Sequence, residues 1–258
     1  MAEKKKQHFV PKLLLRHFSN KIKKAKINIF NVETEFYRVN CPLDSQAQED
    51  YFYGEDKVIE DALGKIEDSA APIIAEIIKE KKFITSDNPC NRYNQYLEKR
   101  NHPGGHLGLF SKGLQLFFPI SPDLMLLYYD KWAYKFGNKK DKEIILTDEN
   151  DINHLNLLQL ANCHKICIFD DSVSEMYLKN LTSKVNNLRQ KDKSKLYKSG
   201  KRHLDIDGNE RITYIHQTED RKLNLKLSFV KEPQGAKSHN LTNHFVQLRN
   251  ENMRDFKG

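Results

Sequence analysis

The chain has 258 residues, of which 38% are hydrophobic and 30% are charged, and it carries a formal net charge of +8. A chain of this length forms one large domain, or one domain with an appendage, and buries enough apolar surface to fold without a disulfide or a metal. It has no apolar run of the roughly 18 to 20 residues that a membrane span requires, and its charged start, Met1–Lys6, is unlike a secretory signal. We therefore expect a cytoplasmic protein without a membrane span. The positive charge attracts polyanions, although solvated surface lysines also explain it.

Four cysteines, Cys41, Cys90, Cys163 and Cys167, are spaced without any Cys-x-x-Cys pair. Cys163 and Cys167 lie one helical turn apart around His164, but no second pair of ligands follows at zinc-finger spacing. The pattern predicts four reduced thiols, mostly buried, in a reducing compartment.

In the first third of the chain, helix and strand patterns alternate. Val10–Phe18 has the apolar stripe and the early proline of a short helix, and Lys26–Val39 has the alternation of a β-hairpin. Apolar residues at three- and four-residue spacing predict a long helix over Asp56–Lys81, with a kink or break at Pro72. A strand is predicted at Phe83–Thr85.

A long polar loop, Ser86–Lys112, is predicted to follow that strand. The elements predicted after the loop are strands at Leu114–Phe118 and Leu124–Tyr129, a helix at Ile152–His164, a strand at Ile166–Phe169, a basic helix at Val173–Lys198, a hairpin around Asp207-Gly208 and a strand at Leu223–Val230.

Together these elements predict an α+β fold, in which a small mixed or antiparallel sheet packs with several helices and is followed by a C-terminal basic helix and β-hairpin. We expect residues 1–170 to form the α+β core and residues 171–231 to form the basic helix and hairpin packed on it. Residues 232–258 are expected to form a polar tail.

Gln7-His8-Phe9-Val10-Pro11 places a histidine just before the first helix. Because proline disfavours helical backbone at the residue before it, Val10 is expected to be extended, and His8 is held on an extended lead-in. A histidine so held can bind a metal or move a proton near neutral pH, or it can cap or pack beside the helix.

On the predicted helix Asp56–Lys81, Glu60 and Glu67 lie two turns apart at the edge of the apolar stripe. Two carboxylates at a core boundary repel each other unless a cation, a proton or a basic partner lies between them. The pair is therefore a candidate catalytic site, and salt bridges to lysine or arginine are the alternative.

Ser86-Asp87-Asn88-Pro89 directly follows the predicted strand Phe83–Thr85, and a strand end is a rigid mount for a carboxylate. Asp87 is thus a further candidate catalytic residue, and a local Asx-turn is the alternative.

The stretch Lys179–Arg202 is rich in cations, which suits contact with a phosphate backbone or, alternatively, a solvated helix. Its candidate nucleic-acid-binding residues are Lys184, Arg189, Lys191, Lys195, Lys198, Lys201 and Arg202.

The order of four motifs resembles a widespread microbial family, domain-of-unknown-function family 4238. Gln7-His8-Phe9-Val10-Pro11, followed by Leu15-Arg16-His17-Phe18, resembles the opening of its members, and Glu60–Glu67 resembles their Glu-rich helix. Ser86-Asp87-Asn88-Pro89 and Phe118-Pro119-Ile120-Ser121-Pro122 resemble the family's Ser-Asp-x-Pro strand end and its Phe-Pro-x-Ser-Pro segment. The chain looks shortened between Lys81 and Lys82, where the family pattern has further helices.

The resemblance implies that His8, Glu60, Glu67 and Asp87 recur as a set. A histidine and three carboxylates would suit one or two divalent metal ions, Mg²⁺ or Mn²⁺, and with a basic surface this favours phosphodiester hydrolysis. The expected function is a metal-dependent phosphodiesterase or nuclease, such as a microbial defence or toxin effector.

Two alternatives to the nuclease stay open. One is a nucleic-acid-binding module without catalysis, led by the basic stretch Lys179–Arg202. The other is a protein-interaction or structural domain, in which an exposed side of the aromatic run Phe117–Tyr129 packs on a protein partner or a second copy.

Overall fold

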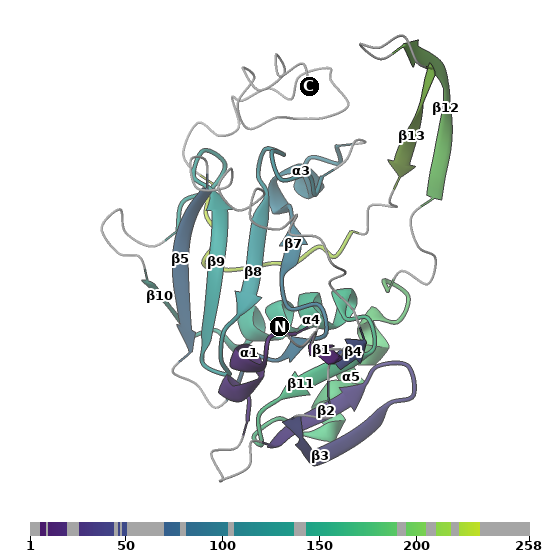
Figure 1. Cartoon of the computed structure of the whole chain (residues 1–258). Helices are drawn as coiled ribbons and strands as arrows, with labels where there is room; N and C mark the ends of the chain where they lie inside the picture. Colours follow the sequence, from purple (N-terminus) through teal and green to yellow (C-terminus); the bar gives the residue numbers. More distant parts are fainter. Residues whose placement is uncertain are drawn as a thin grey trace.

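The computed structural model of the chain describes residues 6–8, 10–19, 26–43, 46, 48–50, 70–77, 81–102, 106–136, 143–189, 195–204, 210–217 and 222–232. Within these residues a five-stranded sheet and a four-stranded sheet pack with several helices, which confirms the predicted α+β class. Figure 1 shows the two sheets in different parts of the molecule, with helix α4 (Glu149–Asn162) where they meet.

The five-stranded sheet is antiparallel except at one edge. Its strand order is β10-β5-β9-β8-β7, in which β10 and β5 are parallel. The strands are β5 (Ala70–Ile77), β7 (Asn91–Tyr93), β8 (Gln115–Pro119), β9 (Leu124–Asp130) and β10 (Glu143–Leu146). β8 and β9 confirm two predicted strands, and their side chains alternate between faces: Phe117 and Leu127 are buried, whereas Leu116 and Tyr128 are half-buried on the opposite face.

The four-stranded sheet is antiparallel throughout its described pairs, in the order β3-β2-β11-β6. Its strands are β2 (Lys26–Asn31), β3 (Phe36–Pro42), β6 (Thr85–Ser86) and β11 (Ile166–Phe169). β2 and β3 confirm the predicted hairpin. In its turn, Asn31 Oδ1 accepts hydrogen bonds from the backbone N–H groups of Glu33 and Thr34, and Glu35 adopts a left-handed φ of 55°.

Local capping explains where the helices begin. Besides α4, they are α1 (Lys12–His17), α3 (Gln95–Lys99) and α5 (Glu175–Val185). Asn94, Asp148 and Ser174 each accept a hydrogen bond from the first turn of α3, α4 and α5, respectively. α1 follows Pro11 and confirms the predicted short helix. In the described parts of the chain, no helix is both long and apolar enough to cross a membrane.

Helix α4 joins the cores of the two sheets. Its residues Ile152, Leu155 and Leu158 lie in the core of the five-stranded sheet, and Leu160 and Ala161 lie in the core of the four-stranded sheet. Because one helix supplies apolar side chains to both cores, the sheets are coupled through buried surface and not through a loop alone.

Helix α1 packs on a third, smaller cluster. Leu15 of α1 and Phe18, which directly follows the helix, lie with Ile27 and Ile168 of the four-stranded sheet. Phe118 of the five-stranded sheet packs against the same cluster. The N-terminal helix is thus a second contact between the two sheets.

Strand β5 corrects the predicted helix Asp56–Lys81. Ala70–Ile77 pairs along its length with β9, and burial alternates from Ile74 onward, as in a strand. The isoleucine and alanine residues of this segment fit the hydrophobic spacing of a helix and also that of a strand. Pairing with β9 stabilises the strand. Pro72 lies within this strand, opposite Tyr128 of β9, so it does not kink or break a helix there. Residues 51–69 lie outside the described residues.

Three further predictions are corrected. The predicted loop Ser86–Lys112 contains strand β7 and helix α3. The predicted basic helix Val173–Lys198 ends as α5 at Val185, because its buried apolar stripe is not continued into the lysine-rich residues that follow. The predicted strand Leu223–Val230 is irregular. That segment buries Leu225, Leu227 and Val230 in the core of the five-stranded sheet.

Two antiparallel ribbons lie outside these sheets. β1 (Lys6–His8) pairs with β4 (Gln48–Asp50), and β12 (Lys195–Leu204) pairs with β13 (Glu210–Gln217). The second ribbon confirms the predicted hairpin, with longer strands than predicted, while Asp207-Gly208 lies outside the described residues. In Figure 1 the β12–β13 ribbon stands away from both sheets.

Candidate functional site

The Ser86-Asp87-Asn88-Pro89 motif lies where the chain passes from the smaller sheet to the larger one. Ser86 ends β6 of the four-stranded sheet, and Asn91 begins β7 of the five-stranded sheet. Helix α4 contacts both strands. The motif therefore occupies the junction of the two sheets and of the helix that joins their cores.

Asp87 binds the turn that follows α4. Its Oδ1 accepts a hydrogen bond from the backbone N–H of His164 at 2.7 Å, and its Oδ2 accepts from the N–H groups of Lys165 at 2.6 Å and Ile166 at 2.9 Å. The Cys163 thiol donates to Oδ1 at 3.4 Å. Four donors fill the acceptor positions of the carboxylate, so Asp87 acts here as a clamp on the turn. Its catalytic role stays a prediction.

The four cysteines are free thiols, as predicted, and Cys41, Cys163 and Cys167 are buried while Cys90 is exposed. Burial raises the pKa of the Cys163 thiol well above its usual range, and the Asp87 carboxylate raises it further. Burial also raises the pKa of the Cys167 thiol. Both thiols therefore stay protonated at neutral pH and are unsuited to act as nucleophiles.

Two buried amide side chains of α4 hold the motif in place. Gln159 Nε2 donates to Ser86 Oγ at 2.7 Å and to the carbonyl of Asn88 at 3.1 Å. One turn earlier, Asn156 Oδ1 accepts from the backbone N–H of Ile84 at 3.1 Å. The junction is therefore built from polar side chains whose partners lie some 70 residues away in sequence.

The structure places the other predicted metal ligands only in part. His8 ends strand β1, opposite Gln48 of β4, so its backbone lies on an extended lead-in to α1, as predicted. Glu60 and Glu67 lie outside the described residues. Across the described ranges, no group of three or more histidine, cysteine, aspartate and glutamate side chains could hold a metal ion. The four-residue metal site stays a prediction.

The predicted nucleic-acid-binding residues fall on three places. Lys184 lies on the exposed side of α5, Arg189 follows that helix, and Lys191 lies outside the described residues. The largest group is carried by strand β12 and consists of Lys195, Lys198, Lys201 and Arg202.

Arg189 is held by backbone carbonyls. Its guanidinium donates to the carbonyls of Val32 at 3.3 Å, Cys163 at 3.3 Å and His164 at 2.8 Å. The turn after α4 is thus bound from two sides, because Asp87 accepts from its N–H groups and Arg189 donates to its carbonyls.

A group of buried polar side chains that sequence reasoning missed lies around α3. Burial raises the pKa of Glu98, and hydrogen bonds from the N–H of Asn224 and the hydroxyl of Tyr93 lower it in part. His106 also faces this carboxylate, and its Nε2 lies 2.7 Å from the carbonyl oxygen of His102. The sequence signal was the four-residue spacing of Glu98, His102 and His106, hidden inside a predicted loop. The cluster ties α3 to the irregular segment 222–232.

A family model described as "Protein of unknown function (DUF4238)" matches residues 6–82 and 79–173. The two matched stretches overlap at residues 79–82, and the shortening predicted between Lys81 and Lys82 stays a prediction. They span the elements from β1 to β11, including the junction motif. No curated protein and no solved structure matches the chain.

Proposed function

The chain belongs to the DUF4238 family, and we propose that it is a nucleic-acid-binding protein whose β12–β13 ribbon contacts the phosphate backbone. The observation that carries this proposal is the placement of the basic stretch. Four of the predicted binding residues lie within eight positions of strand β12, on a ribbon that stands away from both sheets.

The register of the ribbon groups two of these cations. Lys198 pairs with Tyr214 and Arg202 pairs with Ile212, with a register shift between the two pairs. Because Tyr214 and Ile212 are two residues apart on β13, the backbone positions of Lys198 and Arg202 lie about 7 Å apart along the ribbon. A two-stranded ribbon fits the major groove of DNA, and cations on it release counterions from the phosphates.

A binding measurement tests the ribbon. Fluorescence anisotropy of labelled duplex and single-stranded DNA and RNA is measured with the full chain and with Lys198→Gln/Arg202→Gln. We expect the double variant to bind the preferred nucleic acid about tenfold more weakly and to lower the salt dependence by roughly two ion releases. The control Arg38→Gln/Lys226→Gln removes the same charge from exposed positions outside the basic stretch. Equal losses in both variants, or no binding by the wild type, would contradict the proposal.

Metal-dependent phosphodiester hydrolysis is the second candidate. The backbone position of His8 supports it, because pairing with β4 holds this candidate ligand on extended chain shortly before α1. With Glu60, Glu67 and Asp87 it would hold Mg²⁺ or Mn²⁺, which polarises a phosphate oxygen and lowers the pKa of a bound water. It ranks second because the acceptor positions of Asp87 are occupied by the turn after α4.

A cleavage assay separates the two candidates. The protein is incubated with single- and double-stranded RNA and DNA in Mg²⁺, in Mn²⁺ and in chelator, beside Glu67→Ala. Metal-dependent cleavage that Glu67→Ala loses would establish hydrolysis. Binding without cleavage would leave the binding module, and a protein that neither binds nor cleaves nucleic acid would leave a protein-interaction role.

A further inference from the structure

The one tryptophan of the chain, Trp132, is held out to solvent at the end of the five-stranded sheet. Its side chain is 63% exposed, although it lies two residues beyond Asp130, the fully buried last residue of β9. An indole usually contributes to folding by being buried, so an exposed indole on a fixed mount suits a ligand that covers it.

The mount of Trp132 is rigid. Asp130 Oδ1 accepts from the backbone N–H of Trp132 at 2.9 Å, and Asp130 Oδ2 accepts from the N–H of Gly113 at 2.8 Å. The buried hydroxyl of Tyr134 donates to the carbonyl of Gly113 at 2.7 Å and accepts from the N–H of Tyr96 at 2.8 Å. Gly113 has a φ of 78°, and a Cβ there would lie 2.5 Å from the Tyr96 Cβ, so the turn requires glycine.

Cations surround this turn. In the described residues of segments 99–112, 130–136 and 231–232, six lysine and arginine side chains accompany two carboxylates, an excess of four positive charges. Of the carboxylates, Asp130 is buried and Glu232 pairs with Arg100 at 2.8 Å. The six cations are Lys99, Arg100, Lys112, Lys131, Lys135 and Lys231.

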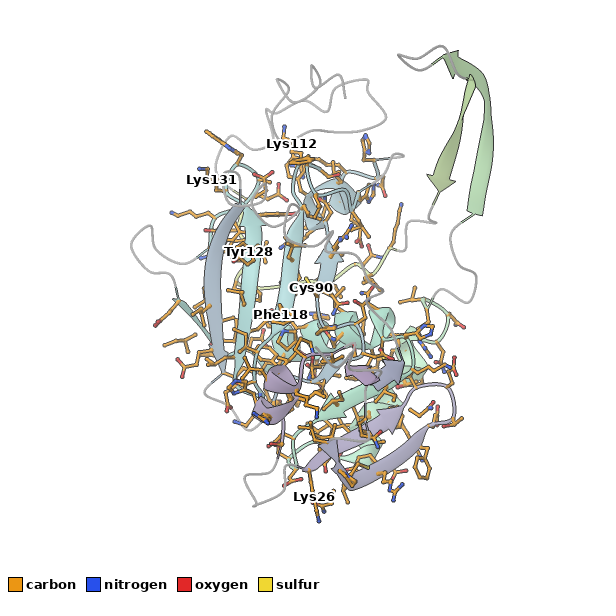
Figure 2. The ribbon with its side chains drawn as sticks, viewed as in Figure 1. Lys26, Cys90, Lys112, Phe118, Tyr128 and Lys131 are labelled. Atoms are coloured by element: carbon orange, nitrogen blue, oxygen red, sulfur yellow. The ribbon has the colours of Figure 1, made fainter. Side chains whose placement is uncertain are left out.

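Short contacts connect several of these cations to the tryptophan turn. Lys131 Nζ lies 5.9 Å from the centroid of the Trp132 ring, and the backbones of Lys135 and Lys231 bond each other at 2.7 Å. Lys112 directly precedes the Gly113 that Asp130 binds. Figure 2 shows Lys112 and Lys131 at the same end of the five-stranded sheet.

We propose that this surface, made of Lys112, Lys131, Trp132, Lys135 and Lys231, binds single-stranded nucleic acid. An unpaired base stacks on the Trp132 indole while the lysines contact the neighbouring phosphates, the combination that single-strand-binding proteins use. A duplex hides the faces of its bases, so the exposed indole selects the single strand. Apart from Lys231, the surface lies within the family-matched residues, whereas the β12–β13 ribbon lies beyond them.

Intrinsic fluorescence tests this proposal directly, because the chain has one tryptophan. Titration of the full chain with a 12-nucleotide oligothymidylate or oligouridylate is expected to quench the fluorescence to saturation. Trp132→Ala should bind the same oligonucleotide about tenfold more weakly in an anisotropy assay, and Trp132→Phe should restore most of the affinity, since a ring remains for stacking. Thermal unfolding verifies that both variants fold.

Three outcomes would overturn the proposal. The first would be quenching by inorganic polyphosphate as strong as that by the oligonucleotide, because polyphosphate has charge but no bases. The second would be a blue shift of the emission with vesicles rich in phosphatidylserine and no change with oligonucleotides. That result would assign the surface to membrane binding. A folded Trp132→Ala that binds the single strand as tightly as the wild type would exclude stacking.

The test is separable from that of the ribbon. Lys198→Gln/Arg202→Gln leaves the Trp132 surface intact, so we expect oligonucleotides to quench its fluorescence as in the wild type. Loss of the quench in this variant would assign the effect to the ribbon and contradict an independent site.

Discussion

The junction between the two sheets and the Trp132 surface use polar residues in opposite ways. At the junction, Asp87, Asn156, Gln159 and Arg189 direct their polar atoms at backbone and side chains of the protein itself. At the Trp132 surface, the polar atoms of buried Asp130 hold a turn. The Trp132 indole and the side chains of Lys131, Lys135 and Lys231 are exposed there.

This difference separates residues that build the fold from residues that can meet a partner. A polar side chain on a rigid strand end suggests catalysis when it is read in isolation, yet its partners decide what it does. Buried polar groups need hydrogen-bond partners, and in the junction those partners lie in the protein.

Replacing Asp87 should give the largest effect. Asp87→Asn keeps the shape of the side chain but replaces one carboxylate oxygen with an NH₂ group. That group cannot accept from the N–H groups of Lys165 and Ile166, so we expect a loss of about 3 kcal/mol in the free energy of unfolding. Urea denaturation measures it. Asp148→Asn is the matched control, since asparagine caps helices as well as aspartate does, and should cost less than about 0.5 kcal/mol.

A stable Asp87→Asn variant would contradict the distinction between a structural junction and a binding surface at Trp132. If that variant unfolded like the wild type but lost a metal-dependent cleavage activity, Asp87 would be a catalytic residue and the junction would be a working site.

Asn156→Leu tests the buried amides of the junction. Leucine has a similar size but leaves the N–H of Ile84 and the carbonyl of Lys82 without their side-chain partner, so we expect a loss of about 2 kcal/mol. Chemical denaturation measures the change, with exposed Asn187→Leu as the control. A neutral result would mean that the amide network adds little to packing.

The sequence predicted elements well where one pattern dominated. Apolar, aromatic runs predicted β8 and β9, and the proline-initiated helix α1 and the hairpin β2–β3 followed from local chemistry. Ala70–Ile77 was predicted wrongly because its apolar residues fit two periods, and the choice depends on β9, about 50 residues away.

The site was harder to predict for the same reason. Asp87 could be located on a strand end from its neighbours, but the turn that occupies it begins more than 70 residues later. No hydrophobic period in the sequence pointed to Trp132 as a surface residue. The turn that carries it is held by Asp130, which binds the N–H groups of Gly113 and Trp132, and the first of these contacts is not local. Local patterns describe the mount of a residue, whereas its partners come from the tertiary fold.

Arg189→Met should have a smaller effect on stability. It removes the donor to three carbonyls but keeps the apolar part of the side chain, and the half-buried carbonyls gain access to water, so we expect a loss of about 1 kcal/mol. Nucleic-acid affinity should stay within twofold, because the guanidinium is directed at the protein. A tenfold loss of affinity in the anisotropy assay, with stability unchanged, would move Arg189 from the junction to the binding surface.

The smallest effect is expected from the pH dependence of Glu98. Burial raises the pKa of this carboxyl in the folded chain above the ordinary value of 4.5, despite hydrogen bonds from Asn224 and Tyr93 and the nearby His106, which lower it. Between these pKa values the native state binds more protons than the unfolded state. The stabilisation is therefore full below the unfolded pKa and is lost as the pH rises through the folded one.

Glu98→Gln cannot ionise and keeps an acceptor for the N–H of Asn224. The free energy of unfolding of the wild type, relative to this variant, should therefore fall as the pH rises above about 4.5 and level off once the carboxyl is ionised in both states. Urea denaturation at a series of pH values measures the difference, with Glu33→Gln in an exposed turn as the control. A difference that stays constant across this range would show that the hydrogen bonds of Glu98 offset the effect of burial on its pKa, and a difference that rises would show that they outweigh it.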